Sequence, residues 1–78
     1  MEKVRVLIDS IGKVKDFVNI ISKFDTDFDM VSGRYVIDAK SIMGIFSLDL
    51  SSPIDLVVHT QGENLAVILE KIKGYIVK

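Results

Sequence analysis

Two spacings of hydrophobic residues alternate along the chain and divide it into strands and helices. Residues 1–9 carry apolar side chains at every second position, including Val4, Val6 and Ile8, which is typical of a half-buried strand. Residues 14–24 carry them three and four positions apart, which predicts an amphipathic helix. Ser10 stands where the spacing changes, and a serine there is expected to cap the helix.

Alternation returns after this helix. Phe28 and Met30 are expected on one face of a second strand, with Asp27 and Asp29 on the other. The pair Ser32-Gly33 is a turn signal, and a short β-prone run follows it. Residues 27–37 are therefore predicted to form a β-hairpin.

The run from Val36 to Leu50 begins extended and then takes on helical spacing. Ser41 precedes the spaced apolar residues Ile42, Met43, Ile45 and Phe46. A short helix should therefore start near Ser41, with the Ser41 side chain as its N-cap. A short amphipathic helix buries one side only. We expect Ile42 and Ile45 to face mostly inward, and Met43 and Phe46 to be exposed.

The last third of the chain predicts one more strand and one more helix. Pro53 forces a loop, and residues 54–60 alternate as a strand. Thr60 and Glu63 have the spacing of a capping box, and an apolar stripe then runs from Leu65 to Ile76. The order is βαββαβα in a single domain of residues 1–78, an α+β fold. Helices with one apolar stripe must cover one face of the sheet, and the hairpin requires antiparallel strands, so the predicted architecture is a two-layer open-faced sandwich.

Composition and charge exclude several classes of function. The net charge is −1, with 10 basic residues scattered among 11 acidic ones, which argues against a nucleic-acid partner. The absence of cysteine excludes disulfides and thiolate metal sites. No apolar run resembles a membrane span or a signal peptide, so we expect a cytoplasmic protein without a membrane partner.

Few residues offer catalytic or metal chemistry. Asp25, Asp27 and Asp29 lack the glycine, the distal glutamate and the further ligands of an EF-hand loop, so we interpret them as solvent-facing acids. The single histidine, His59, has no second ligand at a suitable spacing. No nucleophile and base stand at a credible spacing either. The sequence therefore predicts no metal, no cofactor and no enzymatic activity of its own.

The central segment Asp38-Ala39-Lys40-Ser41-Ile42-Met43-Gly44-Ile45, continuing to Ser47-Leu48, resembles the regulatory serine segment of HPr, the phosphocarrier protein of the bacterial sugar phosphotransferase system. A weaker similarity covers Ser22-Lys23-Phe24-Asp25 and the length and element order of the chain. The resemblance implies a four-stranded sheet of order 1-4-2-3. It also implies a small cytoplasmic protein that accepts a phosphoryl group on a histidine and is regulated at the serine corresponding to Ser41.

The chain lacks the part of the HPr pattern that contains the phosphoryl-accepting histidine. In HPr proteins the acceptor stands in a Gly-x-His-x-Arg-Pro segment between the first strand and the first helix. Residues 9–17 here contain no histidine, arginine or proline. The chain is thus identified as a divergent HPr-like protein lacking the active-site histidine. His59 falls on the solvent side of the last predicted strand, and we interpret it as a surface residue rather than a replacement acceptor.

Ser41 allows two interpretations: a helix cap that is never modified, or a regulatory phosphorylation site. A phosphoryl group there would meet the positive end of the helix and the ammonium of Lys40. Lys40, Ser41, Met43 and Phe46 form the predicted docking surface.

Three functions remain open at this point. The first is a regulatory or protein-interaction module. The second is a phosphocarrier with a non-standard acceptor, and the third is a ligand-binding or assembly domain that shares only the layout. The expected partners are proteins, namely HPr kinase, phosphotransferase system proteins or a transcriptional regulator, and the default oligomeric state is a monomer.

Overall fold

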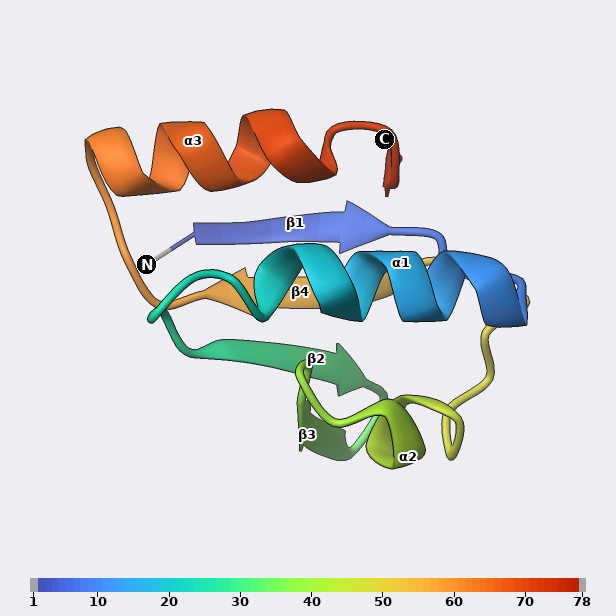
Figure 1. Cartoon of the computed structure of the whole chain (residues 1–78). Coiled ribbons are helices and arrows are strands. Elements are labelled where there is room, and N and C mark those ends of the chain that lie inside the picture. Colours follow the sequence, from blue (N-terminus) through green and yellow to red (C-terminus); the bar gives the residue numbers. More distant parts are fainter. Residues whose placement is uncertain (1, 78) are drawn as a thin grey trace.

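A computed structural model describes residues 2–77 and contains three helices and five strands (Figure 1). In chain order they are β1 (Glu2–Val6), α1 (Ile11–Ile21), β2 (Phe28–Ser32), β3 (Tyr35–Asp38), α2 (Ile42–Ile45), β4 (Ile54–Val58), α3 (Glu63–Ile72) and β5 (Ile76–Val77).

The strands form one antiparallel sheet of order β3-β2-β4-β1-β5. The predicted order 1-4-2-3 is confirmed, as is the β2–β3 hairpin. The α1 and α3 helices lie side by side over one face of the sheet (Figure 1), and the other face has no helical cover among the described residues. The fold is the predicted α+β open-faced sandwich.

The fifth strand was not predicted. The sequence placed Ile76 on the last helix, but α3 ends at Ile72 and Ile76 pairs with Val6. Gly74 comes two residues after the end of the helix and disfavours its continuation, and the free edge of β1 offers backbone partners to the chain that returns. Tyr75 fixes the turn, since its carbonyl accepts from the Leu7 amide at 2.9 Å and its ring meets that of Phe17 edge-on at 5.5 Å.

Fifteen apolar residues from both layers form the buried core, and no polar side chain among the described residues is buried with them. Strand β4 lies at the centre, and its residues Ile54, Leu56 and Val58 face the helices. The alternation predicted in β2 is confirmed as well, with Phe28 and Met30 buried.

The two long helices begin in different ways. Ser10 caps α1 as predicted, because its hydroxyl accepts from the Lys13 amide at 3.2 Å. The capping box predicted at Thr60 and Glu63 is wrong. Gly62 is the N-cap of α3, with φ 74° and ψ −144°, and no side-chain bond caps the helix. Thr60 is too far back, since Gln61 separates it from Gly62, where the chain turns into the helix at a dihedral that only glycine adopts easily.

Candidate interaction site around α2

Asp38 organises the turn that leads from β3 into α2. Its carboxylate accepts from the Lys40 amide at 2.9 Å, and its carbonyl accepts from the Ser41 amide at 3.0 Å. Ser41 then has an extended backbone, φ −94° and ψ 103°, and its Oγ accepts from the Gly44 amide at 3.2 Å. The predicted N-cap is confirmed, and Ser41 is exposed to solvent at the start of the helix.

Gly44 allows the helix to approach both its cap and the sheet. A Cβ at this position would lie 3.2 Å from Ser41 Oγ and 3.3 Å from Ile37 Cδ1. Both distances are tighter than most real Cβ contacts. A side chain at Gly44 would therefore press on the hydroxyl that closes the first turn.

The apolar residues of α2 divide differently from the prediction. Ile45 is fully buried and Met43 is 81% exposed, as expected. Ile42 is 36% exposed and Phe46 39%, so the inward position predicted for Ile42 is wrong. The reason is length: α2 has four residues, about one turn, so one side chain faces the core while its neighbours lie at the rim.

Lys40 ties two loops together. Its ammonium donates to the Phe24 carbonyl at 2.6 Å and lies 5.6 Å from the centre of the Phe28 ring. The side chain is half-buried and holds the segment after α1 against the turn before α2. Of the four predicted docking residues, Met43 and Ser41 are exposed on the surface and Phe46 is partly covered. The ammonium of Lys40 is already bound to the Phe24 carbonyl.

The junction between β1 and α1 holds an ion pair rather than an imidazole. The Lys13 ammonium lies 3.0 Å from Asp9 Oδ1 on the surface, and the two residues are four positions apart. The hydrogen bond from Lys13 and its positive charge lower the pKa of Asp9 below its usual 3.8. The side chains here can cap and stabilise a helix, but no histidine stands among residues 9–17 to accept a phosphoryl group.

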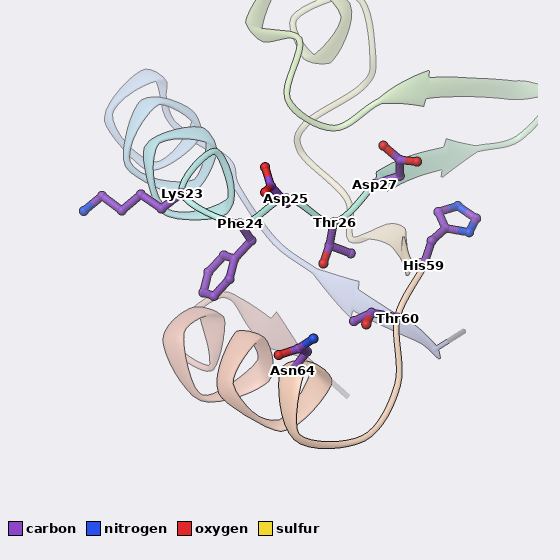
Figure 2. A pocket seen from close by; sticks show the side chains of 8 residues that line it. All are labelled: Lys23, Phe24, Asp25, Thr26, Asp27, His59, Thr60 and Asn64. Carbon is purple, nitrogen blue, oxygen red and sulfur yellow. The ribbon is translucent and has the colours of Figure 1, made fainter.

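His59 lies at the far end of the sheet. β4 runs antiparallel to β1, and Val58 pairs with Glu2, so His59 follows the end of β4 that lies farthest from the β1–α1 junction. His59 borders a cavity of about 520 Å³. Figure 2 shows the side chains that line it, which come from the loop after α1, the end of β4 and the start of α3. The residues lining this cavity are Lys23, Phe24, Asp25, Thr26, Asp27, His59, Thr60 and Asn64.

His59 has a side-chain partner, Asp29, that the pattern of residues did not predict. Its Nε2 lies 2.7 Å from an Asp29 carboxylate oxygen, and both side chains are partly exposed. The two residues are 30 positions apart, and alternation alone does not say which strands are neighbours. The strand order 1-4-2-3, which the resemblance to HPr implies, could have indicated this contact. It places β2 beside β4, with the side chains of Asp29 and His59 on the uncovered face. Asp27 and Asp38 lie close to this pair, since they line a second cavity of about 330 Å³ together with Asp29 and His59.

No group of three or more metal-binding side chains occurs within residues 2–77. In the same range, no helix has the length and apolar character needed to cross a membrane.

The family model described as PTS HPr component phosphorylation site matches residues 13–78. This chain belongs to the HPr family. The HPr-like protein Crh of Bacillus subtilis (strain 168) is 33% identical over 60 residues, covering 77% of this chain and 71% of Crh.

Solved structures of the family share the fold. HPr-C-His from Thermoanaerobacter tengcongensis has a TM-score of 0.74 and 26% identity, covering 95% of this chain and 93% of that one. The phosphocarrier protein HPr from Bacillus anthracis str. Ames has a TM-score of 0.68 and 25% identity, with coverages of 97% and 94%. A structure of B. subtilis Crh, described as a swapped dimer, superposes with a TM-score of 0.62 at 23% identity, covering 96% of this chain and 88% of that one.

Family membership fixes the general character of the protein. HPr phosphocarrier proteins are not catalysts themselves, and they interact with phosphotransferase system proteins and with HPr kinase. The matched region of this HPr-family chain begins at Lys13 and so leaves out Asp9 and Ser10 at the junction before α1.

Proposed function

We propose that this HPr-family chain is a regulatory or protein-interaction module, which docks to other proteins through α2 and is switched by phosphorylation of Ser41. The observation that carries the proposal is the surface of α2. An exposed serine hydroxyl begins the helix, and Met43, 81% exposed, stands two residues on. Methionine adapts well to varied protein surfaces, so this pair offers both a contact and a switch.

The chemistry available at Ser41 is that of a switch. A kinase would transfer the γ-phosphoryl group of ATP to Ser41 Oγ and accept the hydroxyl proton, releasing ADP. The product is a phosphate ester, which is too stable to pass its phosphoryl group onward. The new dianion would lie at the start of α2, where the free amides of the first turn favour negative charge.

Two further observations support a regulatory rather than a carrier role. Residues 9–17 contain no histidine, which we interpret as loss of the family's acceptor. The relative Crh is named HPr-like and is described as a catabolite repression protein of B. subtilis. We therefore propose a cytoplasmic module whose partners are HPr kinase, phosphotransferase system proteins or a transcriptional regulator.

The second candidate is a phosphocarrier that uses His59. It is favoured by one contact: Asp29 holds Nε2 at 2.7 Å, which would orient the imidazole and leave Nδ1 for a phosphoryl group. The surroundings oppose it, because Asp27, Asp29 and Asp38 line the cavity beside this ring and would repel a phosphoryl donor.

Intact-mass spectrometry at neutral to alkaline pH separates the two functions. The protein is incubated with enzyme I and phosphoenolpyruvate, or with an HPr serine kinase and ATP. We expect one acid-stable phosphoryl adduct in the kinase reaction only, present in His59→Gln and absent in Ser41→Ala. An acid-labile adduct in the enzyme I reaction that His59→Gln removes would establish a carrier instead. With no adduct in either reaction, phosphorylation is ruled out and docking alone remains.

Docking is tested separately from modification. Met43→Asp places a charge at the centre of the proposed contact, and Val67→Asp places one on α3, where Val67 is 49% exposed. We expect Met43→Asp to lower the rate of kinase phosphorylation at low protein concentration by about tenfold, the loss of one buried contact, while Val67→Asp leaves it unchanged. Equal rates for the two variants would show that α2 is not the docking surface.

A further inference from the structure

The outer edge of β3 carries unused backbone groups. In an antiparallel pair, residues alternate between hydrogen-bonded and non-hydrogen-bonded positions. The Ala39 amide donates to the Phe28 carbonyl at 3.0 Å, which fixes the alternation along the β2–β3 pair. Val36, opposite Val31, therefore falls at a non-hydrogen-bonded position. Its N–H and C=O point away from β2, toward the open edge of the sheet.

The side chains at this edge are unusually apolar for an exposed strand. Val36 is 64% exposed and Tyr35 is 69% exposed, on opposite faces of β3. Such an edge is a template for pairing with another strand, and sheet proteins usually protect it with charges or cover. The opposite edge of the sheet is β5, which has only two residues.

Arg34 and Asp38 flank Val36 and make the edge complementary to itself. Arg34 lies in the turn directly before β3 and Asp38 ends the strand, so an antiparallel copy that places Val36 opposite Val36 also brings Arg34 near Asp38 at both ends. A parallel copy would bring arginine to arginine and aspartate to aspartate. The charges thus select the antiparallel register in which the free groups of Val36 meet each other.

The negative charge of Asp38 favours pairing with a cation of another molecule. It lies directly across the β2–β3 pair from Asp29, so two carboxylates face each other on the uncovered face. Asp29 has His59 at 2.7 Å, whereas no ion pair within residues 2–77 involves Asp38 or Arg34. The nearby Lys40 is committed to the Phe24 carbonyl.

We propose that two copies of this protein associate edge to edge through β3, antiparallel about a two-fold axis at Val36, so that the two sheets become continuous. Each Val36 would donate to and accept from the other, and Arg34 of each copy would pair with Asp38 of the other. On the helix-covered side, Tyr35 would lie against Ile37 of the second copy. This interface is separate from the exchange of a chain segment between subunits.

Disulfide trapping tests the register directly, because the chain contains no cysteine. Val36→Cys places two thiols opposite each other at about 5.5 Å between Cα atoms, within the range a disulfide spans. Tyr35→Cys is the matched control, similarly exposed on the adjacent residue, but its two copies would be offset along the strands. We expect Val36→Cys to cross-link at least about tenfold faster under mild oxidation. Equal rates would overturn the proposed register.

Charge exchange tests the association without cysteines, by sedimentation velocity over a concentration series. Arg34→Asp alone and Asp38→Arg alone should each remain monomeric, while an equimolar mixture restores an acid–base pair at both ends and should associate. Lys15→Asp, the same change of charge on α1, should behave as the wild type. Circular dichroism melts establish that each variant is folded. If Asp38→Arg does not fold, Val36→Pro replaces it as the variant expected to remain monomeric, because proline removes only the amide donor at the open edge.

Each result decides the proposal. Association of the wild type that Arg34→Asp abolishes and the mixture restores supports it. A wild type that stays monomeric throughout the series overturns it. A dimer that persists in both Arg34→Asp and Val36→Pro overturns it as well, because it must form through another surface or by exchange of a segment.

Discussion

At the scale of the residue, Ser41 holds the first turn of α2 through one hydrogen bond, from the Gly44 amide to its Oγ at 3.2 Å. Removing a side-chain cap usually costs about 1 kcal/mol of stability. We therefore expect Ser41→Ala to lower the free energy of unfolding by about 1 kcal/mol. Ser41→Asp keeps an acceptor and adds a charge that the helix start favours, so it should raise the free energy by about 0.5 kcal/mol.

Urea denaturation of the three proteins measures both effects. Ser52→Ala, in the exposed loop before β4, is the control and should leave the free energy within about 0.5 kcal/mol of the wild type. A large loss of stability in Ser41→Asp would mean that the Ser41 side chain has no room for a charged group. It would also argue against phosphorylation at this position.

At the scale of the element, α3 depends on the backbone of Gly62 rather than on a side-chain cap. Gly62 has φ 74° and ψ −144°, a region that L-amino acids with a side chain rarely enter, and open space surrounds the site. Gly62→Ala should therefore lower the free energy of unfolding by about 1–3 kcal/mol through backbone strain alone. Thr60→Ala should change it by less than about 0.5 kcal/mol, because Thr60 does not cap the helix.

Thermal and urea unfolding of these two variants compare the two possible starts of α3. If Thr60→Ala proved as costly as Gly62→Ala, the helix would begin with the capping box that the sequence indicated. The same comparison shows why the sequence was misleading. A threonine and a glutamate three residues apart satisfy the capping pattern, but only the path of the chain decides which residue stands at the helix start.

At the scale of the whole molecule, the alternation of residues in β1, β2 and β4 and the helical stripe of α1 were enough to predict the two layers. Local caps such as Ser10 and Ser41 were also predictable, because a cap and its partner lie three residues apart. The resemblance to HPr, not periodicity, supplied the strand order.

The contacts that escaped prediction join distant residues. Lys40 reaches the Phe24 carbonyl across 16 positions, and His59 reaches Asp29 across 30. Strand β5 exists because the edge of β1 lies beside the end of α3. None of these contacts leaves a periodic trace in the sequence.

The position of β4 at the centre of the sheet makes it the strand on which the whole fold should depend. Leu56 is fully buried and pairs with Met30 on one side and Val4 on the other, so its loss would leave a cavity between both halves of the sheet and the helices. We expect Leu56→Ala to lower the free energy of unfolding by about 3 kcal/mol, a large part of the roughly 4–12 kcal/mol that a domain of 78 residues has. Val57→Ala is the matched control, since Val57 is next along the strand but faces the uncovered side and is only half-buried, so it should cost less than about 1 kcal/mol. Urea unfolding by fluorescence of Tyr35 and Tyr75 measures both, and similar losses for the two variants would mean that the uncovered face is buried in solution, as it would be if another molecule lay on it.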